Sequence, residues 1–137
     1  HPKSISKMKA TIKKLTSRSN GWGNDRRKEV LRQYITGWVN YFKLADMRTL
    51  LQRIDEWYRR RIRMVIWKQW KRIKTKLRNL TKLGVAKSKA WQWANTRKGY
   101  WHIAGSFILT TTITSDRLRK AGYLFLSDYY LKVRIKT

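Results

Sequence analysis

Apolar residues recur at spacings of three and four along much of the chain, and this period restricts the possible folds more than any other property of the sequence. At the start, Ile5, Met8, Ile12 and Leu15 form a narrow apolar stripe on a very basic segment. The stripe predicts a first helix with Ser4 as its N-cap, because a serine side chain accepts a hydrogen bond from the free N–H groups of a first turn. The period predicts an all-α fold, a helical bundle of about three long helices followed by several short helices.

Longer apolar patterns predict a second helix from Asp25 to Ala45 and a third from Asp46 to Gly84. Gly37 lies at the edge of the second apolar stripe, where the missing side chain is expected to allow a close approach between helices. The apolar face of the third segment turns by roughly 90° along its length, at about 100° per residue. A straight helix cannot keep both faces on one core, so we expect a bend or break near Trp67–Trp70.

The last third of the chain has shorter patterns. Residues 86–95 predict a short helix. Residues 107–114 are rich in β-branched side chains and fit a strand by propensity, but Ser106 is equally suited to cap a short helix. We favour helices throughout, with Thr114 and Ser127 as the caps of two further helices.

The charge of the chain is almost entirely of one sign. Its 137 residues include 34 Lys and Arg against 7 Asp and Glu, a net charge of +27, and residues 57–115 contain no acid at all. With 42% hydrophobic residues, the chain is not a disordered basic tail. A folded domain with this charge repels itself and requires a polyanion nearby, for which nucleic acid is the default. Two alternatives would also explain the charge: it keeps the protein soluble, or the protein lies on an anionic membrane surface.

A row of cations is the first candidate binding surface. On a helical wheel, six residues of the third segment fall within one arc of roughly 80° and extend about 27 Å. The tryptophan in this row offers a flat surface for a base or sugar; the alternative is a solvated helix face with the tryptophan covered by a neighbouring helix. The row consists of Arg60, Arg63, Trp67, Lys71, Lys74 and Arg78, with Lys68 and Arg72 beside it.

A second cluster combines aromatic and basic residues. Trp91 and Trp93 point about 200° apart on a helix, so one of them is expected at a surface or interface, where it is able to stack on bases. Packing in the core is the alternative for either one. The predicted nucleic-acid contacts in this cluster are Lys87, Lys89, Arg97 and Lys98.

Side chains for catalysis are sparse. The chain has no Cys and 2 His, which excludes a cysteine nucleophile and disfavours a metal site. Asp55 and Glu56 are adjacent and point about 100° apart on a helix, and the other acids are not spaced like a metal-binding set. No stretch approaches the ~20 apolar residues of a membrane span. We therefore expect no catalytic residue, no cofactor or metal site and no membrane partner.

Four motifs, in order, are similar to those of a known family. The run Gly37–Phe42 (GWVNYF) resembles the signature of the group II intron maturase-specific domain. The four motifs span nearly the whole chain, and their order makes the resemblance far more specific than any one motif alone. The other three are Trp67–Arg72 (WKQWKR), Ala94–Trp101 (ANTRKGYW) and Leu126–Tyr130 (LSDYY).

The resemblance implies that the chain is a piece of a group II intron-encoded reverse transcriptase. Residues 1–84 would then be the helical maturase or thumb region (X), and residues 85–137 a basic D-like region that contacts nucleic acid. The implied partners are intron RNA, the RNA–DNA template–primer duplex, target DNA, and the fingers and palm of the parent chain. The implied roles are intron splicing, reverse transcription and retrohoming, inside a cell, in a bacterial cytoplasm or an organelle.

The resemblance also separates binding from catalysis. The RNA-directed DNA polymerase activity and its Mg²⁺ belong to the palm of the parent, and no motif of that palm is present in these 137 residues. The fragment is therefore expected to bind nucleic acid without polymerising or cutting it. A ribosomal-type or other basic RNA-binding protein without a polymerase parent is the alternative function.

Overall fold

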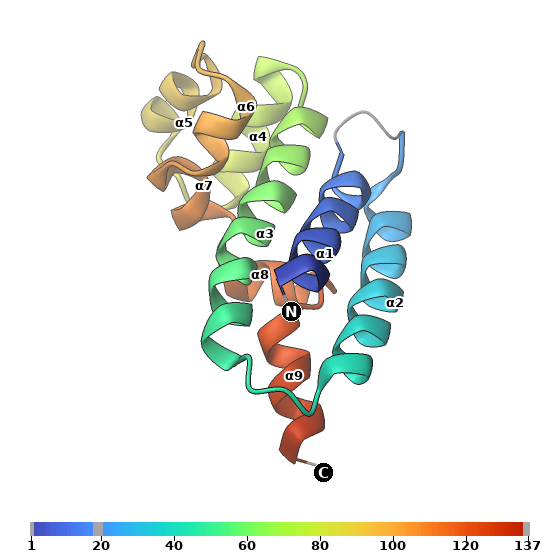
Figure 1. Cartoon of the computed structure of the whole chain (residues 1–137). Helices are drawn as coiled ribbons and strands as arrows, with labels where there is room; N and C mark the ends of the chain where they lie inside the picture. The colour runs from blue at the N-terminus through green and yellow to red at the C-terminus, as the bar shows by residue number, and fades with distance from the viewer. Residues whose placement is uncertain (1, 18–20, 136–137) are drawn as a thin grey trace.

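The structure of the chain, a computed structural model, describes residues 2–17 and 21–135. Within these ranges the chain forms nine α-helices and no strand, which confirms the predicted all-α class. The first three helices have 14, 19 and 22 residues, and the other six have 5 to 10 (Figure 1). In chain order the helices are α1 (Pro2–Leu15), α2 (Asn24–Phe42), α3 (Arg48–Gln69), α4 (Ile73–Lys82), α5 (Lys87–Ala94), α6 (Tyr100–Ala104), α7 (Phe107–Thr112), α8 (Ser115–Lys120) and α9 (Leu126–Ile135).

The helices α1 and α2 bury the apolar stripes that the sequence predicts. Met8 and Ile12 of α1 are fully buried, and so is Leu31 of α2. The start of α1 is earlier than predicted, because the helix begins at Pro2 and not after Ser4. Proline fits a first turn, where its missing N–H would have had no acceptor within the helix. Together the two stripes form one side of the core.

The glycine in the middle of α2 does not serve a close helix contact. Gly37 is exposed, and among the described residues a Cβ built on it would meet no heavy atom within 4 Å beyond the backbone of its own helix. The expectation of a close approach between helices at this position is therefore wrong. Because a mid-helix glycine is about 1 kcal/mol less favourable than alanine, this position lowers the stability of α2.

The expected interruption of the third segment lies between α3 and α4. The first of these helices ends at Gln69 and the second begins at Ile73, which confirms a break near Trp67–Trp70. The end of α4 is capped by Gly84 in the left-handed conformation, with φ +98°. The N–H of Val85 bonds back into the last turn of α4 at 3.1 Å, the pattern of a Schellman C-cap. The chain then reverses, and α5 packs against α4.

The β-branched residues 107–114 form a helix, α7, and not a strand. The hydroxyl groups of Thr111 and Thr112 donate to the carbonyl groups four residues earlier, a pattern that satisfies threonine side chains within a helix. Ser106 and Thr114 occupy the N-cap positions of α7 and α8, as predicted. The Oγ1 atom of Thr114 accepts an N–H from the first turn of α8 at 3.2 Å.

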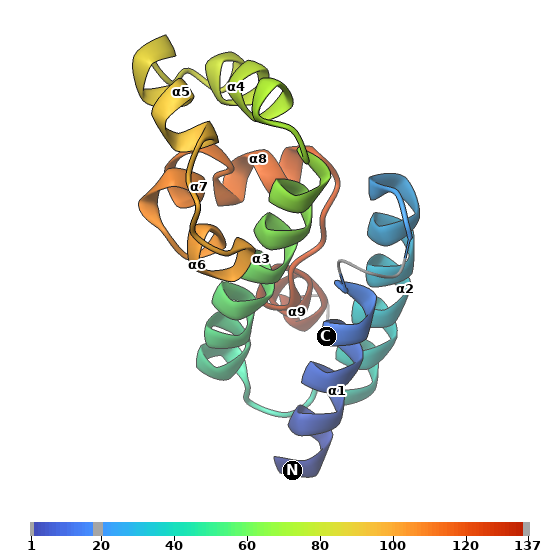
Figure 2. The ribbon, with the colours of Figure 1, turned by 90° about the horizontal axis from the view of Figure 1, so that it is seen from above.

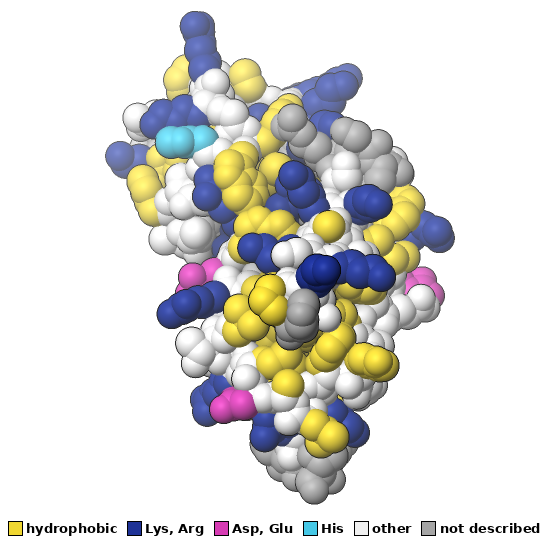
Figure 3. All heavy atoms as spheres, in the orientation of Figure 1, with side chains coloured by type: hydrophobic (Ala, Val, Ile, Leu, Met, Phe, Trp, Pro, Cys, Tyr) yellow, Lys and Arg dark blue, Asp and Glu magenta, His cyan; other side chains and the backbone are white. Residues whose placement is uncertain are grey.

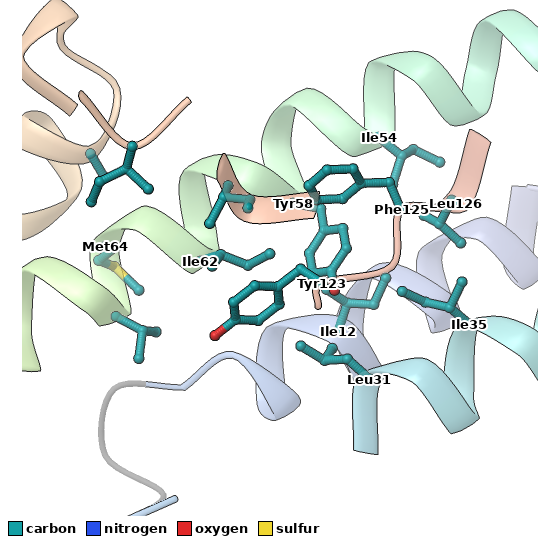
Figure 4. Close-up of a cluster of buried hydrophobic side chains, with 14 of the residues drawn as sticks. Ile12, Leu31, Ile35, Ile54, Tyr58, Ile62, Met64, Tyr123, Phe125 and Leu126 are labelled. Carbon is teal, nitrogen blue, oxygen red and sulfur yellow. The ribbon is translucent and has the colours of Figure 1, made fainter. Parts of the chain in front are cut away.

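The hydrophobic core joins the two ends of the chain. Tyr58 of α3 packs edge-on against Phe125, with ring centroids 5.8 Å apart and ring planes at 82° (Figure 4). Ile12 from α1 and Leu31 from α2 lie in the same cluster (Figure 4). Residues from both sides of Gly84 therefore share one core.

The N-terminus of α9 is capped from another helix. Ser127, the predicted cap, lies inside α9, which begins at Leu126. That expectation is wrong because Asp55 of α3 takes the capping role. The Asp55 carboxylate accepts the backbone N–H groups of Leu126 and Ser127, each at 2.9 Å.

Candidate nucleic-acid interface

The predicted row of cations is divided by the break between α3 and α4. Arg60, Arg63 and Trp67 lie on α3, Lys71 lies in the connection, and Lys74 lies on α4. The members of the row therefore do not follow one straight helix. The surroundings of the residues on α3 differ from those of the residues beyond the break.

Arg60 and Arg63 tie α3 to the short helices beside it. The Nε and Nη2 atoms of Arg60 donate to the carbonyl oxygen of Trp101 at 3.1 and 2.8 Å, and the guanidinium lies 3.9 Å from the centroid of the Trp101 ring. The Nε atom of Arg63 donates to the carbonyl oxygen of Ile113 at 2.7 Å. Burial, together with the positive charge of Arg59, lowers the pKa of Arg63 to about 10. Both arginines therefore have a structural contact within the fold.

Trp67 does not offer a flat surface to a base. Its side chain is 1% exposed, and the Nζ atom of Lys76 lies 4.6 Å from the ring centroid. The centroid of the Trp70 ring lies 6.0 Å from that of Trp67. The prediction that Trp67 stacks on a nucleotide is wrong, because the ring is buried and Lys76 of α4 lies over it. Lys68, in the last turn of α3, is half-buried.

Beyond the break, exposed cations gather on residues 71–98, which we term the basic lobe. Its helices α4 and α5 pack against each other and lie beyond one end of α3, apart from α1 and α2 (Figure 2). The lobe contains no Asp or Glu. Eight of the predicted contact residues are exposed there, together with Lys82: Lys71, Arg72, Lys74, Arg78, Lys87, Lys89, Arg97 and Lys98.

The positive charge of the basic lobe has no carboxylate to balance it within the lobe. The ion pairs found in residues 2–17 and 21–135 lie elsewhere: Lys28 with Asp25 at 4.0 Å, and Arg119 with Asp116 at 2.9 Å and with Asp128 at 2.7 Å. Lys and Arg side chains also spread over the face of the molecule seen in Figure 3, where acidic side chains are few. A surface of one sign attracts a polyanion and raises its local concentration.

The two tryptophans of α5 face different surroundings. Trp91 is 60% exposed, whereas Trp93 packs edge-on against Phe107 with ring centroids 5.5 Å apart. The expectation that one of them lies at a surface is confirmed. Trp91 shares α5 with the exposed Lys87 and Lys89, so an aromatic face and two cations stand on one short helix.

A role that sequence reasoning missed is the pairing of arginines with backbone carbonyl groups at helix C-termini. The Nη2 atom of Arg61 donates to the carbonyl oxygens of Lys13 and Thr16, at 2.9 and 3.1 Å, at the end of α1. Arg63 makes the equivalent contact at the end of α7. Such carbonyl groups carry the negative end of the helix dipole. In a chain with 34 basic and 7 acidic residues, these carbonyl groups take the place of carboxylates as partners of arginine. The paired residues lie far apart in the sequence, so no local pattern predicts them.

Asn40, in the middle of the GWVNYF motif, makes a contact between helices. Its Nδ2 atom donates to the hydroxyl oxygen of Tyr129 in α9 at 3.0 Å. This bond joins α2 to α9. The first and last of the four motifs therefore meet in space.

Groups suited to metal binding are scattered. In the described part of the chain, no three His, Cys, Asp or Glu side chains are grouped so that they could hold a metal ion. His102 is exposed on the short helix α6. Of the helices in residues 2–17 and 21–135, none combines the length and apolar character that a bilayer span requires.

Comparison with known proteins gives one family. No curated protein matches the chain. The family described as "Group II intron, maturase-specific domain" matches residues 5–84, more than half of the chain. The matched segment contains α1 to α4, and with them the GWVNYF and WKQWKR motifs. The chain therefore belongs to the group II intron maturase-specific domain family.

Proposed function

We propose that this domain binds group II intron RNA through the basic lobe and thereby assists splicing of the intron. The observation that carries the proposal is the exposure of nine Lys and Arg side chains on residues 71–98 without a single acid among them. Lysines and arginines on a rigid support bind a phosphate backbone by releasing its counterions. The maturase family supplies the source of the RNA, a group II intron.

The proposal extends to the parent protein. In it, residues 1–84 act as the thumb of a reverse transcriptase and residues 85–137 as a D-like region. The thumb then also contacts the RNA–DNA template–primer duplex and the fingers and palm of the parent, of which the palm holds Mg²⁺. The D-like region contacts target DNA. The support for this extension is the order of the four motifs, and the roles that follow are reverse transcription and retrohoming.

The domain would act by binding alone. Its cations hold and position RNA, while polymerisation belongs to the parent chain. Exposed Trp91 adds a surface on which an unpaired base stacks, and stacking of this kind tolerates any base. Specificity for the intron would then come from the shape of the RNA that fits the lobe.

Salt dependence is the direct test of this function. If the domain contacts about seven phosphates of a duplex, the logarithm of the binding constant falls with the logarithm of salt concentration, with a slope of about −6. The measurement is fluorescence anisotropy of a labelled intron stem-loop titrated with the 137-residue chain at several salt concentrations. Affinity that does not change with salt would contradict the proposal.

A competition experiment separates the intron from other RNA. Unlabelled intron RNA is expected to displace the labelled stem-loop at lower concentration than an equal mass of ribosomal RNA. Equal displacement by both would instead support a general RNA-binding protein of the ribosomal type. Displacement by anionic vesicles in preference to RNA would support a membrane-surface protein.

A further inference from the structure

A pocket outside the basic lobe is lined by three arginines of α3. It lies between α3, the end of α6, α7 and the start of α8, and it has a volume of about 430 Å³. Among the described residues that line it, Glu56 is the one acid, against three guanidinium groups. The polar side chains of this arginine pocket are Glu56, Arg59, Arg60, Arg63, Thr110 and Ser115.

Arg63 is a largely buried cation that no carboxylate pairs with in the described part of the chain. Its side chain is 6% exposed, and its Nε atom is used by the carbonyl oxygen of Ile113. In the part of the chain that the structure describes, its two Nη atoms donate to no acceptor, and no carboxylate lies within ion-pair distance of them. The charge of Arg63 is therefore met by one carbonyl group, and an anion in the pocket would give its Nη atoms a charged acceptor. The pKa of Arg63 is lowered because burial and the charge of Arg59 both disfavour the cation.

The guanidinium of Arg60 is held at the wall of the same pocket by its bonds to Trp101. Gly105 makes room for it, because a Cβ built on Gly105 would stand 2.5 Å from the Cζ and Nε atoms of Arg60. The Nη1 atom of Arg60 has no acceptor among the residues described. The fold therefore fixes two guanidinium groups with unused N–H donors at one pocket.

Hydroxyl groups complete the donor set. On α7, the hydroxyls of Thr111 and Thr112 are used by their own helix. The hydroxyl of Thr110, which lines the arginine pocket, makes no such bond within the described ranges. Ser115, at the start of α8, adds a second hydroxyl group.

We propose that the arginine pocket binds one phosphate group of the RNA backbone, held by the guanidinium groups of Arg59, Arg60 and Arg63 and by the hydroxyls of Thr110 and Ser115. Planar guanidinium groups donate paired hydrogen bonds to phosphate oxygens. The open pocket leaves room for the sugars on either side. This site rests on the proposed RNA-binding function and adds to it a phosphate contact away from the basic lobe.

The first test uses inorganic phosphate as the probe and the 137-residue chain as the protein. Titration with phosphate is expected to shift the ¹⁵N–¹H signals of the Nε groups of Arg60 and Arg63 in a saturable manner. In Arg63→Gln, the amide nitrogen is placed near the former Nε and keeps a donor for Ile113, while the charge and both Nη atoms are lost. Its affinity for phosphate is expected to fall at least about tenfold, since a charge-assisted pair is removed.

Two further variants keep the test independent of folding defects. Glu56→Gln removes the carboxylate at the exposed rim and is expected to strengthen phosphate binding severalfold. Thr110→Val keeps the shape of the side chain and is expected to weaken binding about fivefold, the size of one hydrogen bond. Thr111→Val, the matched control on the same helix, is expected to leave phosphate affinity unchanged. A lack of saturable shifts, or equal affinities in all four variants, would overturn the pocket as an anion site.

The second test uses RNA. Arg63→Gln is expected to weaken stem-loop binding and to make the salt slope shallower by about one, as expected for one lost phosphate contact. If phosphate binds the pocket but RNA affinity is the same in Arg63→Gln and Glu56→Gln, the pocket holds free anions and the RNA part is overturned. If wild type itself shows no salt-dependent RNA binding, the proposed function fails, whatever the pocket does with phosphate.

Discussion

The carboxylate of Asp55, in the middle of α3, accepts hydrogen bonds from both the backbone N–H and the hydroxyl group of Ser127 in the first turn of α9, at 2.9 and 2.5 Å. A further bond comes from the N–H of Leu126 at 2.9 Å. The first N–H groups of a helix have no acceptor within it, and a negative charge is favoured at that end. Asp55 thus replaces a local cap and fixes α9 to the centre of the fold.

Loss of this cap is expected to destabilise the whole domain. Asp55→Asn replaces one acceptor oxygen with an NH2 donor that faces an N–H group, so the free energy of unfolding should fall by about 1–3 kcal/mol, the cost of leaving a buried donor unpaired. Urea unfolding followed by circular dichroism measures the change. Glu56→Gln, at the exposed neighbouring position, is the control and should stay within about 0.5 kcal/mol of wild type. Equal stability of the two variants would show that Asp55 does not cap α9.

The pH dependence of this effect has a definite sign. Burial raises the pKa of Asp55, while the hydrogen bonds from Ser127 and Leu126 oppose the rise. Because the folded state holds the proton more tightly than the unfolded state, the contribution of Asp55 to stability is largest below the unfolded pKa and decreases as pH rises through the folded pKa. The difference in unfolding free energy between wild type and Asp55→Asn should therefore be larger in acid than at neutral pH. A difference that grows with rising pH would contradict the assignment.

Two glycine substitutions are expected to have opposite effects. In Gly105→Ala the new methyl group displaces the guanidinium of Arg60 from its bonds to Trp101, and the loss of such a bond costs roughly 0.5–1.5 kcal/mol. In Gly37→Ala no neighbour is disturbed, and the unfolding free energy should rise by about 1 kcal/mol because alanine favours a helix. Thermal unfolding of both variants, compared with wild type, measures the two signs. A destabilised Gly37→Ala would mean that the glycine has a role in packing.

The helices themselves were largely predictable from the sequence. Local signals are sufficient to predict that a segment is helical. Examples are the spacing of Met8 and Ile12, the drift of the apolar face before Gln69, and the capping residue Thr114. Helix ends were less predictable, since the cap of α9 is Asp55, which lies far away in the sequence.

The candidate site was predictable only where side chains stay in solvent. Charge density pointed to the exposed cations of residues 71–98, a range in which the sequence has no acid to pair with them. The helical wheel gave the wrong surroundings for Trp67, because a position on a wheel does not show whether another helix covers it. In the structure Trp67 is buried. The arginine pocket was not predictable, because Arg63 and Thr110 meet through the packing of separate helices.

Charge reversal on the basic lobe tests the proposed RNA surface. Lys71→Glu, Lys74→Glu and Arg78→Glu together are expected to weaken RNA binding and to reduce the salt slope by about three, or about one for each phosphate contact. All three side chains are exposed, so the unfolding free energy should change little. Anisotropy titrations at several salt concentrations measure both the affinity and the slope.

A matched variant separates the position of the charge from its amount. Arg48→Glu, Arg53→Glu and Lys132→Glu change the net charge equally, at exposed positions on the early part of α3 and on α9. These elements lie at the opposite end of the molecule from α4 and α5 (Figure 1). If both triple variants lose RNA affinity to the same extent, binding depends on total charge, and the basic lobe is not the interface.

The exposed tryptophan of α5 should contribute to RNA binding and not to stability. Trp91 is 60% exposed, so Trp91→Ala is expected to leave the unfolding free energy nearly unchanged and to weaken binding of single-stranded RNA about tenfold, through loss of about 1–3 kcal/mol of stacking. Trp67→Ala, at a buried position, should instead destabilise the fold by about 3–5 kcal/mol. Trp91→Tyr retains an aromatic face and is expected to recover most of the affinity. If Trp91→Ala binds as well as Trp91→Tyr, the residue does not stack on RNA, and the cations of the lobe act without it.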